Sequence, residues 1–160
     1  MNTNIQEIKN LSIGFKSQKG EQISILRNIT TTVRKGETVG IVGESGSGKS
    51  TLALAMMGYI KHGLFTTGGE CFFKSLDLLK LNNKELVEIR GRKIAMIPQN
   101  AGQALTPNLK IGYQIEEALK LHTDFNKVER EQKISELLNQ VRLPSPKIMA
   151  LRYPHELSGG

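Results

Sequence analysis

The chain of 160 residues is long enough for one domain with a sizeable core, and its 38% apolar and 23% charged residues are typical of soluble globular proteins. The longest apolar window, residues 52–60, is far shorter than the roughly 20 residues that cross a bilayer, so no transmembrane helix is predicted. The net charge of +7 fits a phosphate-rich ligand, anionic lipid or a membrane-protein partner. Nucleic acid is not predicted, because the basic residues are scattered apart from a cluster at residues 90–93 and have no interleaved aromatic groups.

The first third of the chain is predicted to form strands. Its first ten residues lack the basic and apolar regions of a secretory signal peptide, so no secretion is predicted. Apolar residues nearly alternate over residues 5–15, and residues 23–33 are rich in β-branched side chains, which favours two strands. Residues 34–36, Arg-Lys-Gly, indicate the turn that ends the second strand.

A strand, a glycine-rich turn and a helix are predicted in the next segment. Residues 37–43 form a short apolar run bounded by glycine, which is typical of a strand buried on both faces. From Lys49 the sequence changes to good helix formers, and this helix is predicted to end near Gly58.

A short strand over residues 70–73 is predicted to follow Gly68 and Gly69, and it holds the only cysteine, Cys71. A single cysteine excludes an internal disulfide and fits a reducing cytoplasm. Its two phenylalanine neighbours indicate a buried thiol rather than a reactive one.

A helix and a further strand are predicted before residue 100. Asn82 or Asn83 is predicted to cap a helix over residues 84–90. Residues 93–99 are a second run typical of a buried strand, and Pro98 ends it.

Residues from about 100 onward are predicted to be helical, with apolar stripes that favour packing within a subdomain. The first helix contains residues 115–122, and a second begins near Lys127. Prolines at positions 144 and 146 end it before a short helix over residues 147–151. The two stripes consist of Ile115, Ala118, Leu119 and His122, and of Ile134, Leu137, Leu138 and Val141.

The segment GESGSGKS matches the pattern G-x-x-x-x-G-K-[ST] of a phosphate-binding loop and lies between a predicted buried strand and a helix, as that loop requires. Glycines let successive backbone N–H groups converge on phosphate oxygens, and the helix N-terminus adds a positive field. Lys49 is predicted to contact the β and γ phosphates, and the Ser50 hydroxyl to ligate Mg²⁺. The predicted nucleotide-binding residues of this segment are Gly43, Glu44, Ser45, Gly46, Ser47, Gly48, Lys49, Ser50 and Thr51.

A phosphate-binding loop by itself leaves GTPases, kinases, helicases and transporter motors open. A GTPase would show an N-K-x-D-like motif that recognises guanine, which this sequence lacks. A small-molecule kinase would need a lid and a substrate pocket, which the sequence does not identify.

Three motifs in order narrow these alternatives: VGIVGESGSGKST, then IAMIPQN, whose Gln99 lies fifty residues after Lys49, then YPHELSGG. Together they resemble the ATP-binding subunits of ABC transporters, in which a phosphate-binding loop, a Q-loop, a helical subdomain and a signature motif follow in this order. The resemblance covers essentially the whole chain. It implies an α/β fold with a P-loop NTPase-like core, made of N-terminal antiparallel strands and a partial parallel sheet, and an α-helical subdomain.

The resemblance also implies boundaries and residue roles. The core would span about residues 1–99, the helical subdomain about 100–157, and the start of the signature motif 157–160. Gln99 would ligate Mg²⁺, sense the γ-phosphate and link it to the membrane subunit. Phe15 is the best match to the aromatic residue that stacks on adenine, although a core phenylalanine is the alternative interpretation.

The last three residues, Ser158, Gly159 and Gly160, would begin the L-S-G-G-Q signature at a helix N-terminus. In the family this helix end contacts the ATP bound by the opposite subunit, so that two ATP molecules lie in a two-fold dimer. None of the three histidines is assigned chemistry, and no metal site of the His/Cys type is predicted.

The motifs look most like those of the dipeptide, oligopeptide and nickel import subgroup. There the Q-loop is followed by a stretch resembling D-P-x-x-S-L-N-P, whereas residues 100–107 here read NAGQALTP. Leu105 and Pro107 match the leucine and the last proline of that stretch, but the Asp-Pro pair at its start is absent. In the family this loop lies near the transmembrane coupling surface, so the departure leaves the exact partner and substrate open.

The function implied is that of a motor subunit, or its N-terminal fragment, which couples ATP binding and hydrolysis to import of a peptide or nickel. The cofactors would be ATP and Mg²⁺, and the location the cytoplasmic face of the membrane. The partners would be transmembrane permease subunits, a second ATP-binding subunit and, indirectly, a substrate-binding protein.

Two alternatives stay open. A non-transport relative, such as a repair or translation factor, is disfavoured because the separation of 59 residues from Gln99 to Ser158, with two modest helices, favours a compact helical subdomain over a long coiled coil. A nucleotide-binding remnant without turnover is the second. The sequence contains no apolar run ending in Asp-Glu, no D-loop and no switch histidine. The isolated chain is therefore expected to be unstable or aggregation-prone, to bind nucleotide weakly at best, and to be inactive in hydrolysis.

Overall fold

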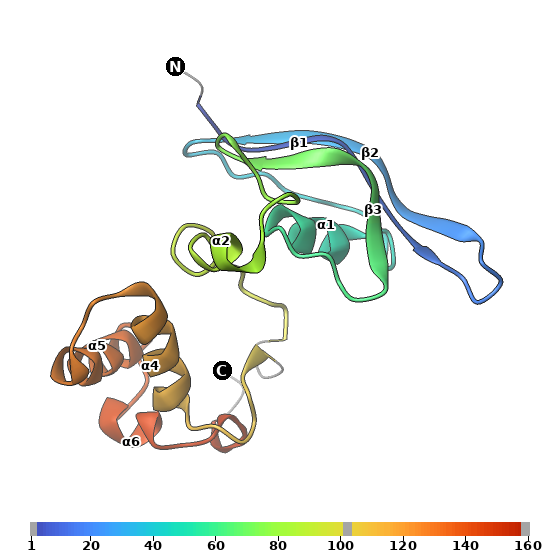
Figure 1. Cartoon of the computed structure of the whole chain (residues 1–160). Coiled ribbons are helices and arrows are strands. Elements are labelled where there is room, and N and C mark those ends of the chain that lie inside the picture. The colour runs from blue at the N-terminus through green and yellow to red at the C-terminus, as the bar shows by residue number, and fades with distance from the viewer. Residues whose placement is uncertain (1–2, 101–103, 158–160) are drawn as a thin grey trace. The chain divides into compact units, whose positions relative to one another are not determined.

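The chain folds as a strand-rich unit, Met1–Arg90, followed by a helical unit, Gly91–Gly160. Figure 1 shows the computed structural model, which describes residues 3–100 and 104–157. None of the helices in these ranges is long and apolar enough to cross a membrane. The first unit contains β1 (Asn4–Lys16), β2 (Gln22–Arg34), α1 (Lys49–Met56), β3 (Leu64–Phe73), β4 (Leu76–Asp77) and α2 (Asn83–Val87). The second contains α4 (Ile111–His122), α5 (Lys127–Gln140), α6 (Pro146–Ala150) and a 3-10 turn (Pro154–Glu156).

An antiparallel sheet of four strands, in the order β2-β1-β3-β4, forms the frame of the first unit. The predictions of two N-terminal strands are confirmed, since β1 and β2 pair with each other and β1 also pairs with β3. The register of β1 shifts against both neighbours around Asn10, whose φ of 49° is left-handed. There the Asn10 backbone N–H donates to the Thr30 hydroxyl at 3.0 Å, so a side chain takes the place of a ladder partner at this bulge.

The core of the first unit is centred on β1. This strand lies between β2 and β3, and one of its faces is covered by α1. Ile8, Leu11 and Ile13 are each 0% exposed. α1 lies against this side of the sheet, as Figure 1 shows, and buries Leu52 and Ala55. The predicted end of this helix is confirmed: α1 stops at Met56, and the left-handed Gly58 follows it.

Cys71 lies in this core, as predicted, and joins β3 to α1. Its thiol contacts the Ala55 carbonyl at 3.4 Å and accepts from the Gln6 amide at 3.5 Å. Burial raises the pKa of the Cys71 thiol, the hydrogen bond from Gln6 lowers it, and the charge of Asp77 raises it further. Together these effects hold the thiol in its neutral, unreactive form.

The folded chain is therefore expected to react slowly with a thiol reagent such as 5,5′-dithiobis(2-nitrobenzoate), and the guanidinium-unfolded chain rapidly. The folded state keeps the Cys71 proton above pH 9.0, the reference pKa, where the unfolded chain releases it. The contribution of the neutral Cys71 thiol to the free energy of unfolding is thus fully present below pH 9.0. It is lost as the pH rises through the folded-state pKa of Cys71. Urea titrations at pH 8 and pH 10 measure this decrease, and a Cys71→Ala variant should show a weaker one. Equal labelling rates in the folded and unfolded chains would contradict a buried thiol.

Two predicted elements have different lengths in the structure. β3 begins at Leu64, so it includes Gly68 and Gly69 instead of starting after them. Pairing with β1 along residues 64–73 supplies the ladder that local sequence does not indicate. α2 ends at Val87, earlier than predicted, and Asn82 caps it with a capping box that includes Glu85.

The two segments predicted as buried strands are not strands, and these predictions were wrong. Residues 37–43 form no regular secondary structure and lie outside the sheet, and Val42 is 96% exposed. In residues 93–99 only Ile94 forms an isolated bridge, and Ile97 is 94% exposed. A strand needs neighbours that pair with its backbone and cover its faces, and none of the described residues provides them. The expected partial parallel sheet is thus absent from residues 3–100 and 104–157, where all pairing is antiparallel.

The helical unit matches the expectation that residues beyond about 100 are helical. α4, α5 and α6 contribute the buried residues Ile111, Ile134, Leu138 and Met149, and Ile115 and Leu119 pack against them. α5 begins as predicted at Lys127, after an Asn126 cap that forms a capping box with Glu129. Ile115, Leu119, Ile134 and Leu138 of the two apolar stripes therefore serve the packing of this unit, whereas Val141 at the end of the second stripe is 67% exposed.

Candidate functional site

The loop of residues 43–48 connects the irregular segment of residues 37–42 to α1 and adopts a conformation that glycine makes accessible. Gly46 and Gly48 have φ values of 82° and 89°, which other residues rarely adopt. Gly48 also lies close to β2, since a Cβ built there would be 2.8 Å from Leu26 Cδ2 and 3.3 Å from the Ile25 carbonyl oxygen. The loop closes on itself through a hydrogen bond from the Ser47 N–H to the Glu44 carbonyl at 3.2 Å.

Lys49 is folded back into this loop. Its Nζ donates to the Gly43 carbonyl at 2.8 Å, the Glu44 carbonyl at 2.5 Å and the Ser47 hydroxyl at 3.3 Å. The loop therefore encloses a cation with backbone oxygens. The same cation is available to an anion that enters the loop and exchanges with these neutral acceptors, because a hydrogen bond between charged groups is stronger than one to a carbonyl.

The N-terminal end of α1 adds to this positive potential. Gly48 has no side chain with which to cap the helix, and the first turn carries no acidic residue. The first intrahelical bond runs from the Leu52 N–H to the Gly48 carbonyl at 2.9 Å, so the amides of residues 49–51 precede the ladder. The first-turn amides, the positive end of the helix dipole and the Lys49 ammonium all belong to the start of α1, a combination that fits a phosphate group.

Phe15 lies near the end of β1, on a strand whose neighbour β2 approaches Gly48. Ile13 pairs with Leu26, whose side chain is directed at Gly48. Phe15 is two residues beyond Ile13 on β1, and side chains two apart share a face of a strand. It is partly buried. Stacking of Phe15 on adenine stays a prediction, and a core role is its alternative.

The other predicted site residues lie elsewhere in the chain. Gln99 is exposed and belongs to the helical unit, whereas Ser50 belongs to the first unit, so their joint binding of Mg²⁺ stays a prediction. Ser158, Gly159 and Gly160 lie outside the described residues, and so does part of the segment that follows Gln99. Within the described ranges, no group of three or more His, Cys, Asp or Glu side chains could hold a metal ion.

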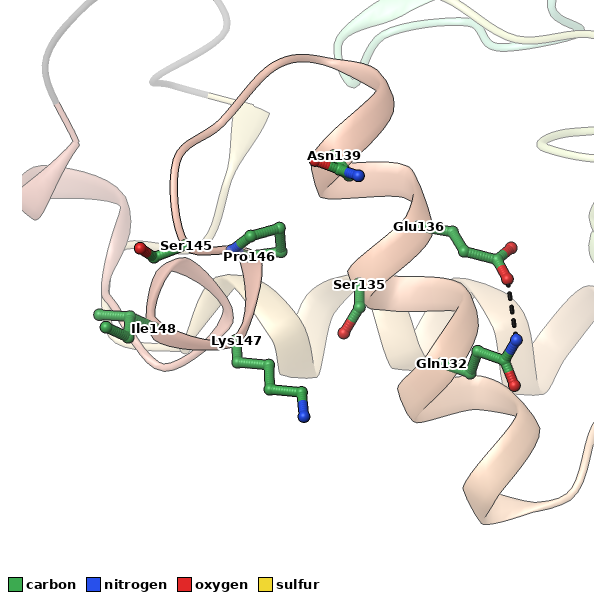
Figure 2. A pocket seen from close by; sticks show the side chains of 8 residues that line it. All are labelled: Gln132, Ser135, Glu136, Asn139, Ser145, Pro146, Lys147 and Ile148. Atoms are coloured by element: carbon green, nitrogen blue, oxygen red, sulfur yellow. Dashed lines mark hydrogen bonds between the residues drawn. The ribbon is translucent and has the colours of Figure 1, made fainter.

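The helical unit has an open hollow of about 590 Å³ between α5 and α6, shown in Figure 2. The surface that lines it is mainly apolar, although several lining side chains carry polar groups. The one interaction drawn there is a hydrogen bond of 3.1 Å from the Gln132 amide to Glu136. It contains none of the predicted site residues, and no motif in the sequence marks it. The lining residues are Gln132, Ser135, Glu136, Asn139, Ser145, Pro146, Lys147 and Ile148.

Two side chains near α1 have contacts that sequence reasoning missed. The Gln6 amide donates to the Met56 carbonyl at 2.7 Å, and Arg90 Nε donates to the Met57 carbonyl at 2.9 Å. Both reach the C-terminal end of the helix whose N-terminal end forms the candidate site. Their separations of 50 and 33 residues along the chain explain why no local signal indicates them.

Comparison with known proteins agrees with this geometry. The family model described as ABC transporter matches residues 26–160. The oligopeptide transport ATP-binding protein OppD of Bacillus subtilis is 39% identical over 99% of this chain and 44% of its own length. The dipeptide transport ATP-binding protein DppD of Escherichia coli is 40% identical over 96% of this chain and 46% of its own length. The chain thus spans less than half the length of the curated relatives it matches.

Solved structures show the same fold. A dimeric ATP-binding cassette, described as a post-hydrolysis state bound to ADP and Pi, matches with a TM-score of 0.81 and 29% identity. The match covers 96% of this chain and 63% of the other. A dimeric bacterial ABC transporter cassette matches with a TM-score of 0.80 over the same shares.

Proposed function

Because the chain belongs to the ABC transporter family, we propose that it is part of an ATP-binding subunit that powers uptake of peptides. One observation carries the proposal: the loop of residues 43–48 holds the Lys49 ammonium against the uncapped N-terminal end of α1. That arrangement places a cation, backbone amides and a helix dipole around one anion site.

In this proposal residues 43–51 bind the triphosphate of ATP. Lys49 exchanges its carbonyl partners for the β and γ phosphates, and the Ser50 hydroxyl and Gln99 hold Mg²⁺, which would neutralise phosphate charge. Phe15 stacks on adenine. The exposed position of Ser50 at the start of α1 leaves its hydroxyl available to a ligand.

The proposed assembly is a two-fold dimer on the cytoplasmic face of a membrane. Ser158, Gly159 and Gly160 would contact ATP held by a second ATP-binding subunit, and permease subunits would receive the motion of the helical unit. The support is that the matched cassettes are described as dimeric and the curated relatives as transport proteins. The domain boundaries proposed for this role are about 1–99 for the nucleotide core and about 100–157 for the helical subdomain.

Transport is favoured over DNA repair by the helical unit. α4, α5 and α6 have 12, 14 and 5 residues and pack around one small core. A long coiled coil would need apolar heptads sustained over several turns more than these helices provide. Among import substrates, peptides are favoured over nickel because the matched relatives carry oligopeptide and dipeptide names.

A second candidate is nucleotide binding without turnover by these 160 residues alone. Gln99 is an amide and Lys49 a cation, and neither provides the carboxylate that commonly polarises the attacking water. The exposed apolar side chains of residues 39–42 indicate a surface that is incomplete in this chain by itself.

Titration of the purified chain with a fluorescent ATP analogue, with and without Mg²⁺, tests nucleotide binding. We expect Mg²⁺-dependent binding and phosphate release no faster than in buffer. Failure to bind would contradict the phosphate site. Hydrolysis that depends on Mg²⁺ and disappears in a Lys49→Ala variant would instead contradict the second candidate and leave the first intact.

A further inference from the structure

The C-terminal end of α1 is held by two side chains from distant parts of the chain. Gln6 donates to the Met56 carbonyl at 2.7 Å, and Arg90 Nε to the Met57 carbonyl at 2.9 Å. α1 has no basic residue in its own last turn, so the guanidinium of Arg90 is the cation recorded at its negative end. The helix that forms the phosphate site at one end is therefore anchored by charge at the other.

Arg90 is itself fixed in place. Its backbone N–H donates to the Leu86 carbonyl at 2.8 Å, and its guanidinium lies 5.8 Å from the centre of the Tyr59 ring. The side chain is partly buried. A guanidinium that donates through Nε while it also lies over an aromatic ring is held at two points, which a lysine ammonium would not reproduce.

Arg90 is also the last residue of the strand-rich unit, and Gly91 is the first of the helical unit. Gly91 has a φ of 79°, and its N–H donates to the Ile94 carbonyl at 2.8 Å. A Cβ built on Gly91 would lie 2.6 Å from His122 Nε2, so its backbone packs directly on the imidazole at the end of α4. Arg90, which contacts the C-terminal end of α1, is thus bonded directly to Gly91, which contacts the last residue of α4.

We propose that Arg90 is a positioning residue that couples anion binding at the N-terminal end of α1 to the segment entering the helical unit. The inference rests on the nucleotide site proposed above. α1 has eight residues and is about 12 Å long, short enough to move as one rigid body when phosphate orders its first turn. A shift of Met57 then moves the Arg90 side chain, and the turn at Gly91 transfers the shift to His122.

Gln6 provides the matched control. It binds the adjacent carbonyl of α1, at a comparable distance, but it lies on β1 and has no connection along the chain to the helical unit. A purely structural role at the end of α1 predicts the same consequence for loss of either side chain. A coupling role predicts that only the loss of Arg90 separates nucleotide binding from the Gly91 turn.

The test is hydrogen exchange of the whole chain, followed by mass spectrometry, with and without a saturating non-hydrolysable ATP analogue and Mg²⁺. In the unaltered chain we expect slower exchange both at residues 43–51 and at residues 91–94. Arg90→Leu should keep the protection at residues 43–51 and lose it at 91–94, with affinity reduced about two- to fivefold. Gln6→Leu should keep both. Circular dichroism verifies that each variant folds. If Arg90→Leu does not fold, hydrogen exchange of Arg90→Lys, which keeps the charge but lacks the guanidinium Nε, tests the coupling instead.

Each outcome is decisive. Protection at residues 91–94 that survives in the Arg90 variants, or that is lost equally in Gln6→Leu, overturns the coupling role. Protection of the loop without any change at residues 91–94 in the unaltered chain overturns the coupling but leaves the proposed function standing. Absence of nucleotide binding in the unaltered chain refutes the proposed function, and the coupling with it.

Discussion

Replacing Lys49 with alanine is expected to weaken ATP binding roughly 10- to 150-fold while leaving the fold intact. The ammonium is the cation around which the loop closes, with hydrogen bonds to the carbonyls of Gly43 and Glu44. A hydrogen bond to a charged group contributes roughly 1.5–3 kcal/mol, which corresponds to that range of affinity. The loop is exposed, so the carbonyls freed by the substitution can be hydrated by water at little cost in stability.

Binding of a fluorescent ATP analogue measures this loss, and circular dichroism verifies the fold. Lys61→Ala is the matched control, because it removes the same charge from an exposed position after α1. The affinity of Lys49→Arg for the ATP analogue should fall between those of Lys49→Ala and Lys61→Ala. Arginine keeps the charge but replaces a compact ammonium with a planar guanidinium. Equal affinities for Lys49→Ala and Lys61→Ala would show that net charge, rather than the loop geometry, attracts the nucleotide.

Replacing Gly69 with alanine is expected to destabilise the strand-rich unit by about 2–5 kcal/mol. Gly69 has a φ of 87°, in the region that side chains disfavour. It also faces the bulge of β1: a Cβ there would lie 2.4 Å from the Asn10 carbonyl oxygen and 2.5 Å from Leu11 Cα. Both neighbours are backbone of the central strand, so relief of this clash requires the sheet itself to move.

Gly63→Ala separates the cost of the left-handed φ from the cost of the backbone clash. Gly63 has a nearly identical φ of 85°, but a Cβ built there meets nothing within 4 Å. Its cost should therefore be the conformational one, about 1–2 kcal/mol. Urea titrations followed by far-ultraviolet circular dichroism compare the two variants. If both lose the same stability, the close contact between β1 and β3 at the bulge is not what requires glycine at position 69.

The glycine-rich loop of residues 43–48 and the helix after it could be predicted from the sequence because their signals are local, whereas phosphate binding by this loop stays a prediction. The spacing of Gly43, Gly48 and Lys49 specifies which backbone can turn and which cation lies within reach. The structure adds that Lys49 is enclosed by the loop and that Gly48 approaches β2 too closely for a side chain. β1, β2, α1 and the helices beyond residue 110 were likewise predictable from local periodicity and capping residues.

Only the tertiary structure decided which apolar runs become strands and what holds α1. Residues 37–43 and 93–99 have the composition of buried strands, yet pairing partners determine whether such a run joins a sheet, and the described residues offer none. β3 gained its first residues for the opposite reason, since β1 was there to pair with them. Gln6 and Arg90 reach α1 across 50 and 33 residues, a separation at which composition and spacing carry no information. The sequence by itself determined which local groups form the candidate site, and the fold decided which distant side chains hold α1, because contacts between distant residues depend on where the backbone brings them.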